Sequence, residues 1–213
     1  SFGNRICSTY FGGPGGEIGT SVITDNNGNV FIGGYTLSTT GISYLGFQNS
    51  HANPMDNDAY LAKFDPLGSR IWSTYFGGVN TDSGCVLASD GTNVFLAGYT
   101  NNTAGIAYNG FQNNFGGGVY DAFLVKFDNL GNRIWSTYYG DQGTEYGNVS
   151  TDSFGNIILS GVTSSELNIA SGGIQNSYGG GANDLFYVVF EPNGNRICSS
   201  YYGGSGNERG GQT

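Results

Sequence analysis

Basic side chains are scarce in this sequence. Its 213 residues include only seven Lys and Arg and a single His, against sixteen Asp and Glu, which gives a formal net charge of -9. Nucleic acids and anionic membranes are bound through basic patches, so this balance argues against both as partners. No apolar run approaches the roughly 18 residues of a membrane-spanning helix, so no membrane span is predicted.

Signatures of catalysis and of metal or cofactor binding are missing as well. Three cysteines, Cys7, Cys85 and Cys198, cannot form a disulfide framework, and we expect unpaired, buried thiols. His51 is the only histidine, and no metalloprotease, serine-hydrolase or phosphate-loop motif is present. The sequence therefore predicts no catalytic, cofactor or metal residues, and no enzyme.

Glycine and aromatic residues are abundant instead. The chain holds 39 Gly, 15 Tyr and 14 Phe, while charged residues make up only 11%. This composition is typical of many short strands joined by glycine-rich turns, and it is too aromatic for a disordered linker.

One nine-residue segment occurs four times, as RICSTYFGG, RIWSTYFGG, RIWSTYYGD and RICSSYYGG. The copies begin at Arg5, Arg70, Arg133 and Arg196, which are 65, 63 and 63 residues apart. A fixed period of this kind indicates a repeat architecture. Tryptophan follows the isoleucine of the two middle copies, and we expect Trp72 and Trp135 to be buried between blades. Cys7 and Cys198 occupy the same position in the outer copies, so we expect them to be packing residues.

Each repeat contains four short runs rich in β-branched and aromatic residues, which predicts four strands. In the second unit they cover residues 83–89, 93–100, 121–128 and 133–139. The second run is apolar on both faces, as expected for a sheet covered on both sides. Sheets stacked around an axis meet this need. The predicted fold is therefore an all-β β-propeller with one four-stranded antiparallel blade per 63–65 residues.

The period predicts three complete blades with additional pieces at each end. Propellers close with about 4 to 8 blades, so the chain is expected to be a fragment of a larger ring, or its repeats continue between molecules. The expected boundaries are an outer strand of a preceding blade at 1–13, blades at 14–78, 79–141 and 142–204, and the start of a next blade at 205–213.

The motifs resemble the SBBP-type bacterial β-propeller repeat. The resemblance rests on Trp-Ser-Thr-Tyr-Phe-Gly-Gly, an acid-x-Gly step, Asp-x-x-Gly-Asn, Gly-Phe-Gln-Asn and Asp-Ala-Phe-Leu-Val-Lys-Phe-Asp, which recur in this order over essentially the whole chain. The third unit departs most, with Ile174 for Phe and Val189 for Lys. The resemblance implies a large secreted or cell-surface protein of Bacteroidetes-like bacteria, without catalytic residues common to the family.

The charged residues also follow the repeat, which indicates structural rather than catalytic roles because an active site needs unlike residues in one place. We expect Asp65 and Arg70 to form a cross-strand ion pair. A second series precedes the glycine of each first strand, and it could form a carboxylate ring for a cation such as Ca²⁺ or cap backbone N–H groups. Its members are Glu17, Asp82, Glu145 and Glu208.

The long loop of each unit carries Gly-Phe-Gln-Asn or Gly-Ile-Gln-Asn, at positions 46–49, 110–113 and 173–176. These groups could bind a sugar or peptide, or they could anchor the loop to its blade. We predict a non-catalytic, extracellular propeller segment with a structural, adhesive or protein-interaction role at the bacterial cell surface. Its partners would be further blades, other protein chains or surface glycans. The alternative is a carbohydrate-binding or carbohydrate-processing propeller.

Overall fold

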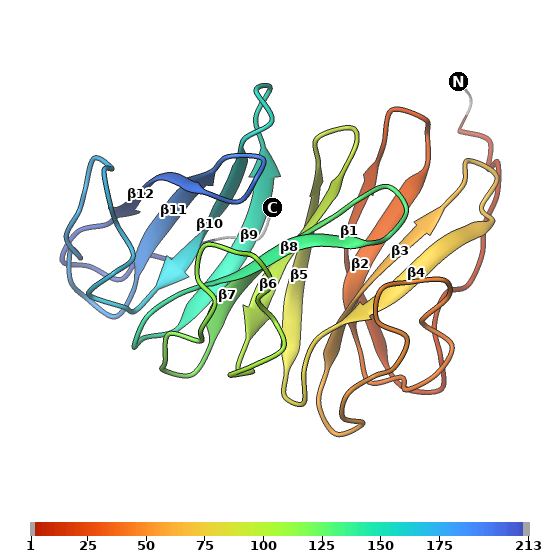
Figure 1. The fold of residues 1–213 in the computed structure, drawn as a ribbon, viewed down its shortest axis with the longest axis horizontal. Coiled ribbons are helices and arrows are strands. Elements are labelled where there is room, and N and C mark those ends of the chain that lie inside the picture. The colour runs from red at the N-terminus through yellow and green to blue at the C-terminus, as the bar shows by residue number, and fades with distance from the viewer. Residues whose placement is uncertain (1–2, 211–213) are drawn as a thin grey trace.

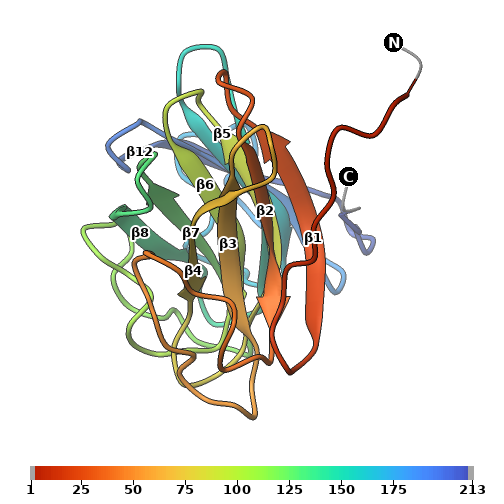
Figure 2. The same cartoon turned by 90° about the vertical axis from the view of Figure 1, so that its right-hand side faces the viewer.

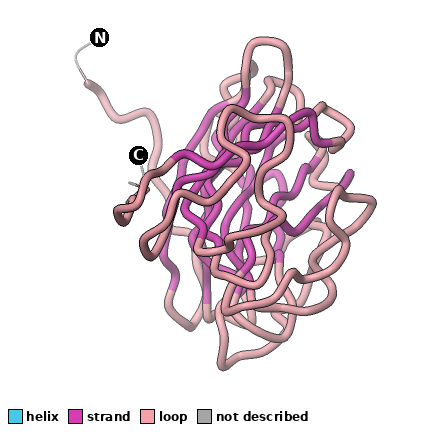
Figure 3. The backbone as a smooth tube through the Cα atoms, turned by 90° about the vertical axis from the view of Figure 1, so that its left-hand side faces the viewer, coloured by secondary structure: helices cyan, strands magenta, loops and turns pink. Residues whose placement is uncertain are grey.

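The computed structural model describes residues 3–210, which form three four-stranded antiparallel sheets and no helix (Figures 1 and 3). The predicted all-β fold with one such sheet per repeat is confirmed. We call the sheets blades 1, 2 and 3. Blade 1 contains β1 Glu17–Thr24, β2 Val30–Thr36, β3 Asp58–Phe64 and β4 Arg70–Phe76. Blade 2 contains β5 Asp82–Ser89, β6 Val94–Thr100, β7 Asp121–Phe127 and β8 Arg133–Tyr139. Blade 3 contains β9 Glu145–Thr151, β10 Ile157–Thr163, β11 Asp184–Phe190 and β12 Arg196–Tyr202.

The blades lie side by side in chain order, and the strands of each follow one another across its sheet (Figure 1). The first strands are neighbours: β5 contacts β1, and β9 contacts β5. Side-chain hydroxyls join them, because Ser21 Oγ accepts the Leu87 N–H at 3.1 Å and Thr151 Oγ1 donates to the Ser89 carbonyl at 2.9 Å. No helix suited to crossing a membrane is found within residues 3–210.

The outer strand of each of the first two blades inserts a tryptophan into the next blade. Trp72 Nε1 donates to the Asn129 carbonyl at 3.1 Å, and Trp135 Nε1 donates to the Pro192 carbonyl at the same distance. Both indoles are buried, so their predicted burial between blades is confirmed. Trp72 lies over Gly131, which has a φ of 87° and where a Cβ would lie 2.8 Å from the ring. Only glycine combines this conformation with this close approach.

The two ends of the chain differ from the expectation. Residues 3–16 form no strand in the described chain, although an outer strand was expected at 1–13, and Figure 2 shows irregular chain beside β1. A strand needs a hydrogen-bonded neighbour, and no other strand of a preceding blade is present among residues 3–210 to pair with it. Residues 205–210 also form no strand, while 1–2 and 211–213 lie outside the described residues.

The cysteines are unpaired, as predicted, but they are not all buried. Cys85 is buried in β5, whereas Cys7 is exposed and Cys198 is half-buried. The predicted burial therefore holds only for Cys85, in the blade that has a described blade on both sides. Cys198 occupies the tryptophan position of blade 3, and no described blade follows it.

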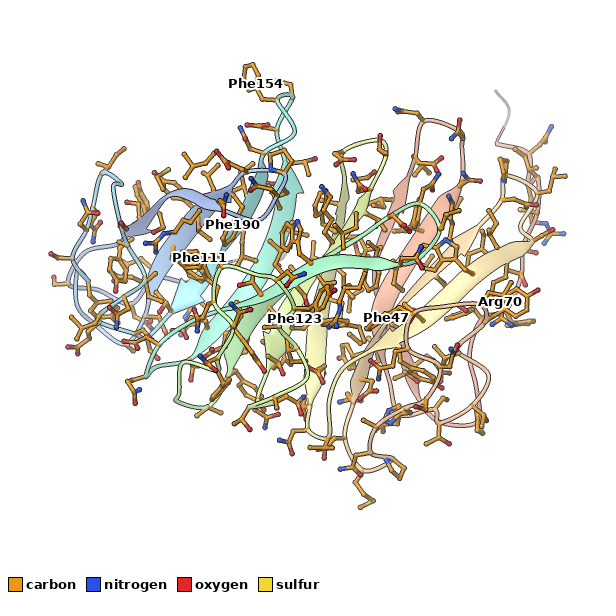
Figure 4. All side chains as sticks on the ribbon, viewed as in Figure 1. Phe47, Arg70, Phe111, Phe123, Phe154 and Phe190 are labelled. Carbon is orange, nitrogen blue, oxygen red and sulfur yellow. The ribbon has the colours of Figure 1, made fainter. Side chains whose placement is uncertain are left out.

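We expect Trp135→Ala to lower the free energy of unfolding by about 3–5 kcal/mol, because it leaves a large cavity between blades 2 and 3. Equilibrium denaturation measures this loss. Phe154→Ala is the matched control: Phe154 projects from the β9–β10 turn into solvent (Figure 4), so its loss is expected within about 0.5 kcal/mol. A loss below about 1 kcal/mol for Trp135→Ala would contradict the observed packing.

Candidate functional site

Two buried carboxyl groups meet where blade 1 joins blade 2. Asp58 begins β3 and Asp82 begins β5, and neither residue has any exposed surface. Both lie against Gly77, the residue after β4, where a Cβ would come within 2.9 Å of an Asp58 oxygen and 2.5 Å of an Asp82 oxygen. The glycine therefore makes room for the two carboxyl groups.

The same arrangement recurs between blades 2 and 3. Asp121 begins β7 and Glu145 begins β9, both are fully buried, and a Cβ on Gly140 would overlap an oxygen of each. After blade 3, Asp184 lies against Gly203 in the same way, and the charge of Glu208 contributes to its raised pKa, although burial is the main cause. Each described blade thus places one such pair at its downstream end.

Backbone and amide N–H groups bind one oxygen of these carboxyl groups. Asp82 Oδ2 accepts the Gly78 N–H at 2.9 Å and the Asn102 side-chain amide at 2.7 Å. Asp121 Oδ2 accepts the Gly116 N–H at 2.6 Å. The bond from the Gly78 N–H to Asp82 matches the capping role that the sequence offered for the acidic series. It differs in one respect, because each such site also holds an aspartate of the preceding blade.

The second oxygen of each aspartate has a different environment. This Oδ1 atom is buried, and no hydrogen-bond partner for it is found among residues 3–210; the four residues are Asp58, Asp82, Asp121 and Asp184. An unpaired, buried carboxylate oxygen is costly in free energy. Two adjacent carboxyl groups remove this cost if they share one proton, since the protonated group donates to the other.

The electrostatics agree with shared protons. Burial raises the pKa of Asp121 to about 7, and the neighbouring charge of Glu145 acts in the same direction. Burial also raises the pKa of Asp58 to about 6, while the charge of His51 opposes this rise. The pKa values of Asp82 and Glu145 are raised by burial too. Asp58 and Asp121 can therefore take up and release a proton near neutral pH.

The acidic series does not gather into one ring. Glu17 accepts hydrogen bonds from Thr36, at 3.0 Å, and from Ser38, both within its own blade. In the described part of the chain, no three Asp, Glu, His or Cys side chains come together as metal ligands would. The described residues form carboxyl pairs between blades rather than a single ring.

The predicted ion pair between Asp65 and Arg70 is wrong. Asp65 Oδ1 instead accepts the N–H groups of Leu67 and Ser69, at 2.9 and 2.8 Å, and closes its own turn. The Arg70 guanidinium lies 4.9 Å from the Tyr44 ring centre and donates to loop carbonyls. The short turn satisfies the carboxylate locally, and the arginine stacks on an aromatic ring instead.

The glutamine side chain of the long loop forms hydrogen bonds within the protein. Gln48 Oε1 accepts the Gly77 N–H at 3.2 Å, and its Nε2 donates to the Ser50 carbonyl and to Asp58. Phe47 packs edge-on against Phe127 of the next blade, with ring centres 6.2 Å apart. The geometry thus supports the anchoring role of these loops over a sugar-binding or peptide-binding role.

The pairing of the two acidic series escaped sequence reasoning, although a signal exists. The two members of each pair are 24 residues apart in the sequence: Asp58 and Asp82, Asp121 and Glu145, Asp184 and Glu208. In every case the glycine that follows the outer strand lies between them. A constant offset of this kind indicates that two acidic positions can face one another across a junction.

Comparison with known proteins agrees with the repeat. A family model described as the SBBP β-propeller repeat matches residues 8–40, which run from the N-terminal segment through β2 into the loop after it. The sheets that follow repeat the same strand order twice. The search of curated proteins returned no match to the chain.

The raised pKa values predict that stability falls with increasing pH. The folded chain holds protons that the unfolded chain releases between about pH 4 and about pH 7, so the stabilisation is complete on the acid side and is lost through this window. Asp121→Asn keeps the shape and needs no shared proton. The thermal midpoint of the wild type should therefore fall more than that of Asp121→Asn when the pH is raised from about 5 to about 8. Each kcal/mol of stabilisation lost by the wild type alone should separate the two midpoints by about 2–4 °C.

Asp152→Asn is the control for this experiment. Hydrogen bonds from Asn156 lower the pKa of Asp152, so its contribution is lost only as the pH falls below the ordinary aspartate range. This variant should keep the wild-type pH dependence between about pH 5 and pH 8. Equal slopes for Asp121→Asn and the wild type would exclude the shared proton.

Proposed function

We propose that this chain is a non-catalytic segment of an extracellular propeller with a structural, adhesive or protein-interaction role at the bacterial cell surface. The match of residues 8–40 to the SBBP β-propeller repeat supports this proposal. The main support is the equivalent use of acidic groups at successive junctions. Asp58 with Asp82, and Asp121 with Glu145, hold the same positions between blades. A catalytic centre needs unlike groups at one place, whereas a scaffold repeats its contacts.

The remaining repeated charges also serve the fold. Asp25 accepts the N–H groups of Asn27 and Asn29, each at 2.9 Å, and closes the first hairpin. Lys63 lies 3.6 Å from Asp25, and Lys126 donates to the Pro192 carbonyl of the next blade at 2.9 Å. Both lysines thus hold neighbouring parts of the scaffold together, which accords with a structural role.

The proposed partners are further blades of the same protein or other protein chains. The downstream face of blade 3 supports this proposal. Ile174 is 96% exposed and Tyr202 is 71% exposed, whereas the residues at the Tyr202 position in blades 1 and 2, Phe76 and Tyr139, are each 1% exposed. Exposed apolar surface of this kind is typical of an interaction site.

Carbohydrate binding is the second candidate, and one observation favours it. Tyr99 lies 4.9 Å from both Tyr120 and Tyr146, measured between ring centres. Tyr99 and Tyr146 line a cavity of about 190 Å³ beside the inner strands, together with Asn148. Aromatic and amide groups around a small cavity suit a sugar. No carboxylate is among the described residues that line it, so the cavity favours binding over hydrolysis.

A glycan array probed with the protein separates the two candidates. The scaffold proposal predicts no glycan bound above background. Glycan binding that is lost in Tyr146→Ala but kept in Phe154→Ala would establish the carbohydrate-binding alternative, because Tyr146 lines the cavity and Phe154 does not. A glycan that is bound and then cleaved over time would overturn the non-catalytic role.

A further inference from the structure

The junction between blades 1 and 2 shows what a complete contact contains. The outer strand of blade 1 places Phe76 against Phe123 and Phe127, with ring centres 5.3 and 6.1 Å apart. The loop before β3 adds Phe47, which lies between Phe127 and the Arg133 guanidinium, 4.5 Å from its ring centre. An outer strand and a loop aromatic of one blade together cover the next blade.

The junction between blades 2 and 3 repeats this arrangement. Tyr139 stacks on Phe186 at 5.5 Å and contacts Phe190 at 6.1 Å. Phe111 lies 6.1 Å from Phe190, next to it in Figure 4, and the Arg196 guanidinium lies 4.5 Å from the Phe111 ring centre. The contact is therefore a repeated property of the protein.

The N-terminal segment, residues 3–16, lies in front of blade 1 and supplies the outer-strand part of this contact but not the loop aromatic. Phe11 contacts Tyr60 and Phe64 at 5.4 and 5.8 Å, which are the counterparts of Phe123 and Phe127. Cys7 lies over Gly68, where a Cβ would come within 3.1 Å of its sulfur, as Trp72 lies over Gly131. Residues 5–11 thus lie where the outer strand of a preceding blade would lie.

Both edges of this segment are open. Strand β4 is bonded to β3 on one edge and to the loop before β3 on the other, through Tyr44 with Ser73 and Gln48 with Tyr75. Within the described chain, residues 5–11 make no hydrogen bond from backbone to backbone. Tyr10 is fully exposed, whereas its counterpart Tyr75 is completely buried.

A cavity marks the place of the missing loop aromatic. It measures about 310 Å³ and is lined by Phe11, Phe64 and Arg70 among others. Phe64 and Arg70 are the counterparts of Phe127 and Arg133, between which Phe47 lies at the next junction. Arg70 lies at the outer end of blade 1 in Figure 4, away from the labelled residues of the other two junctions.

We propose that the N-terminal segment and this cavity form a docking site for the third strand and the preceding loop of another SBBP-type repeat. The incoming strand pairs antiparallel with residues 5–11, as β3 pairs with β4, and its loop bonds the opposite edge. The aromatic residue of the loop fills the cavity beside Arg70. The inference deepens the proposed interaction role, on which it rests, by naming the partner.

The occupant is specified by the two complete junctions. It carries Gly-Phe-Gln-Asn in its loop and an Asp-Ala-aromatic-Leu-x-Lys-Phe strand, as in residues 46–64 and 110–127. Its lysine has a ready acceptor in the Pro66 carbonyl. Pro66 occupies the same turn position as Pro192, whose carbonyl accepts the Lys126 ammonium at 2.9 Å.

The test adds a synthetic peptide of residues 43–64, which contains both elements, to the full chain. Hydrogen exchange measured by mass spectrometry should show new protection of the amides of residues 6–11. A peptide with Phe47→Asp should bind at least about tenfold more weakly, because a charge cannot enter the cavity without losing its hydration. A peptide with Met55→Asp is the matched control, since Met55 is exposed in its own loop.

Three outcomes would each overturn the proposal. The peptide could protect amides of blade 3 alone, the Phe47→Asp peptide could bind as tightly as the original peptide, or a peptide that scattering shows to be monomeric could fail to bind. These outcomes are distinct from failure of the proposed function. A protein that ignores the peptide and all glycans loses this docking site but keeps its scaffold role, whereas a cleaved glycan rejects the non-catalytic role whatever the peptide does.

Discussion

Contact between the faces of successive sheets is the interaction on which this structure depends. Strand β6 is buried along almost its whole length, so blade 2 needs cover on both sides. Trp72 and Trp135 supply part of that cover, and the glycine turns of the next blade make room for them. Since each blade is completed by its neighbour, the repeat is stable only as a stack.

The same contacts explain why carboxyl groups are buried in a chain with few charges. The link from one blade to the next carries backbone N–H groups that need acceptors, and Asp82 and Glu145 provide them. Asp58 and Asp121 approach from the preceding blade and share the space. Blade packing and proton uptake are therefore linked at each junction. The N-terminal segment in front of blade 1 supplies only the outer-strand side of such a contact. Its partner can be specified because the complete junctions show which strand and loop are missing.

The sequence was sufficient to predict the period, the four strands of each blade and the burial of Trp72, because these follow from local patterns that recur at a fixed distance. It did not reveal the pairing of Asp58 with Asp82, since facing depends on how two blades meet rather than on either one. The ion pair of Arg70 failed for a local reason: Asp65 is satisfied by its own turn. Residues 5–11 lie at the expected outer-strand position but form no strand, because pairing needs a neighbour that no local pattern supplies.

Native-state hydrogen exchange, resolved strand by strand, tests the central claim most directly. If contact between blade faces provides most of the stability, the two middle strands of blade 2, β6 and β7, should exchange more slowly than their counterparts in blades 1 and 3. The reason is that only blade 2 has a complete described blade on both sides. Uniform protection across the three blades would show that each sheet is stable by itself, and it would contradict the account.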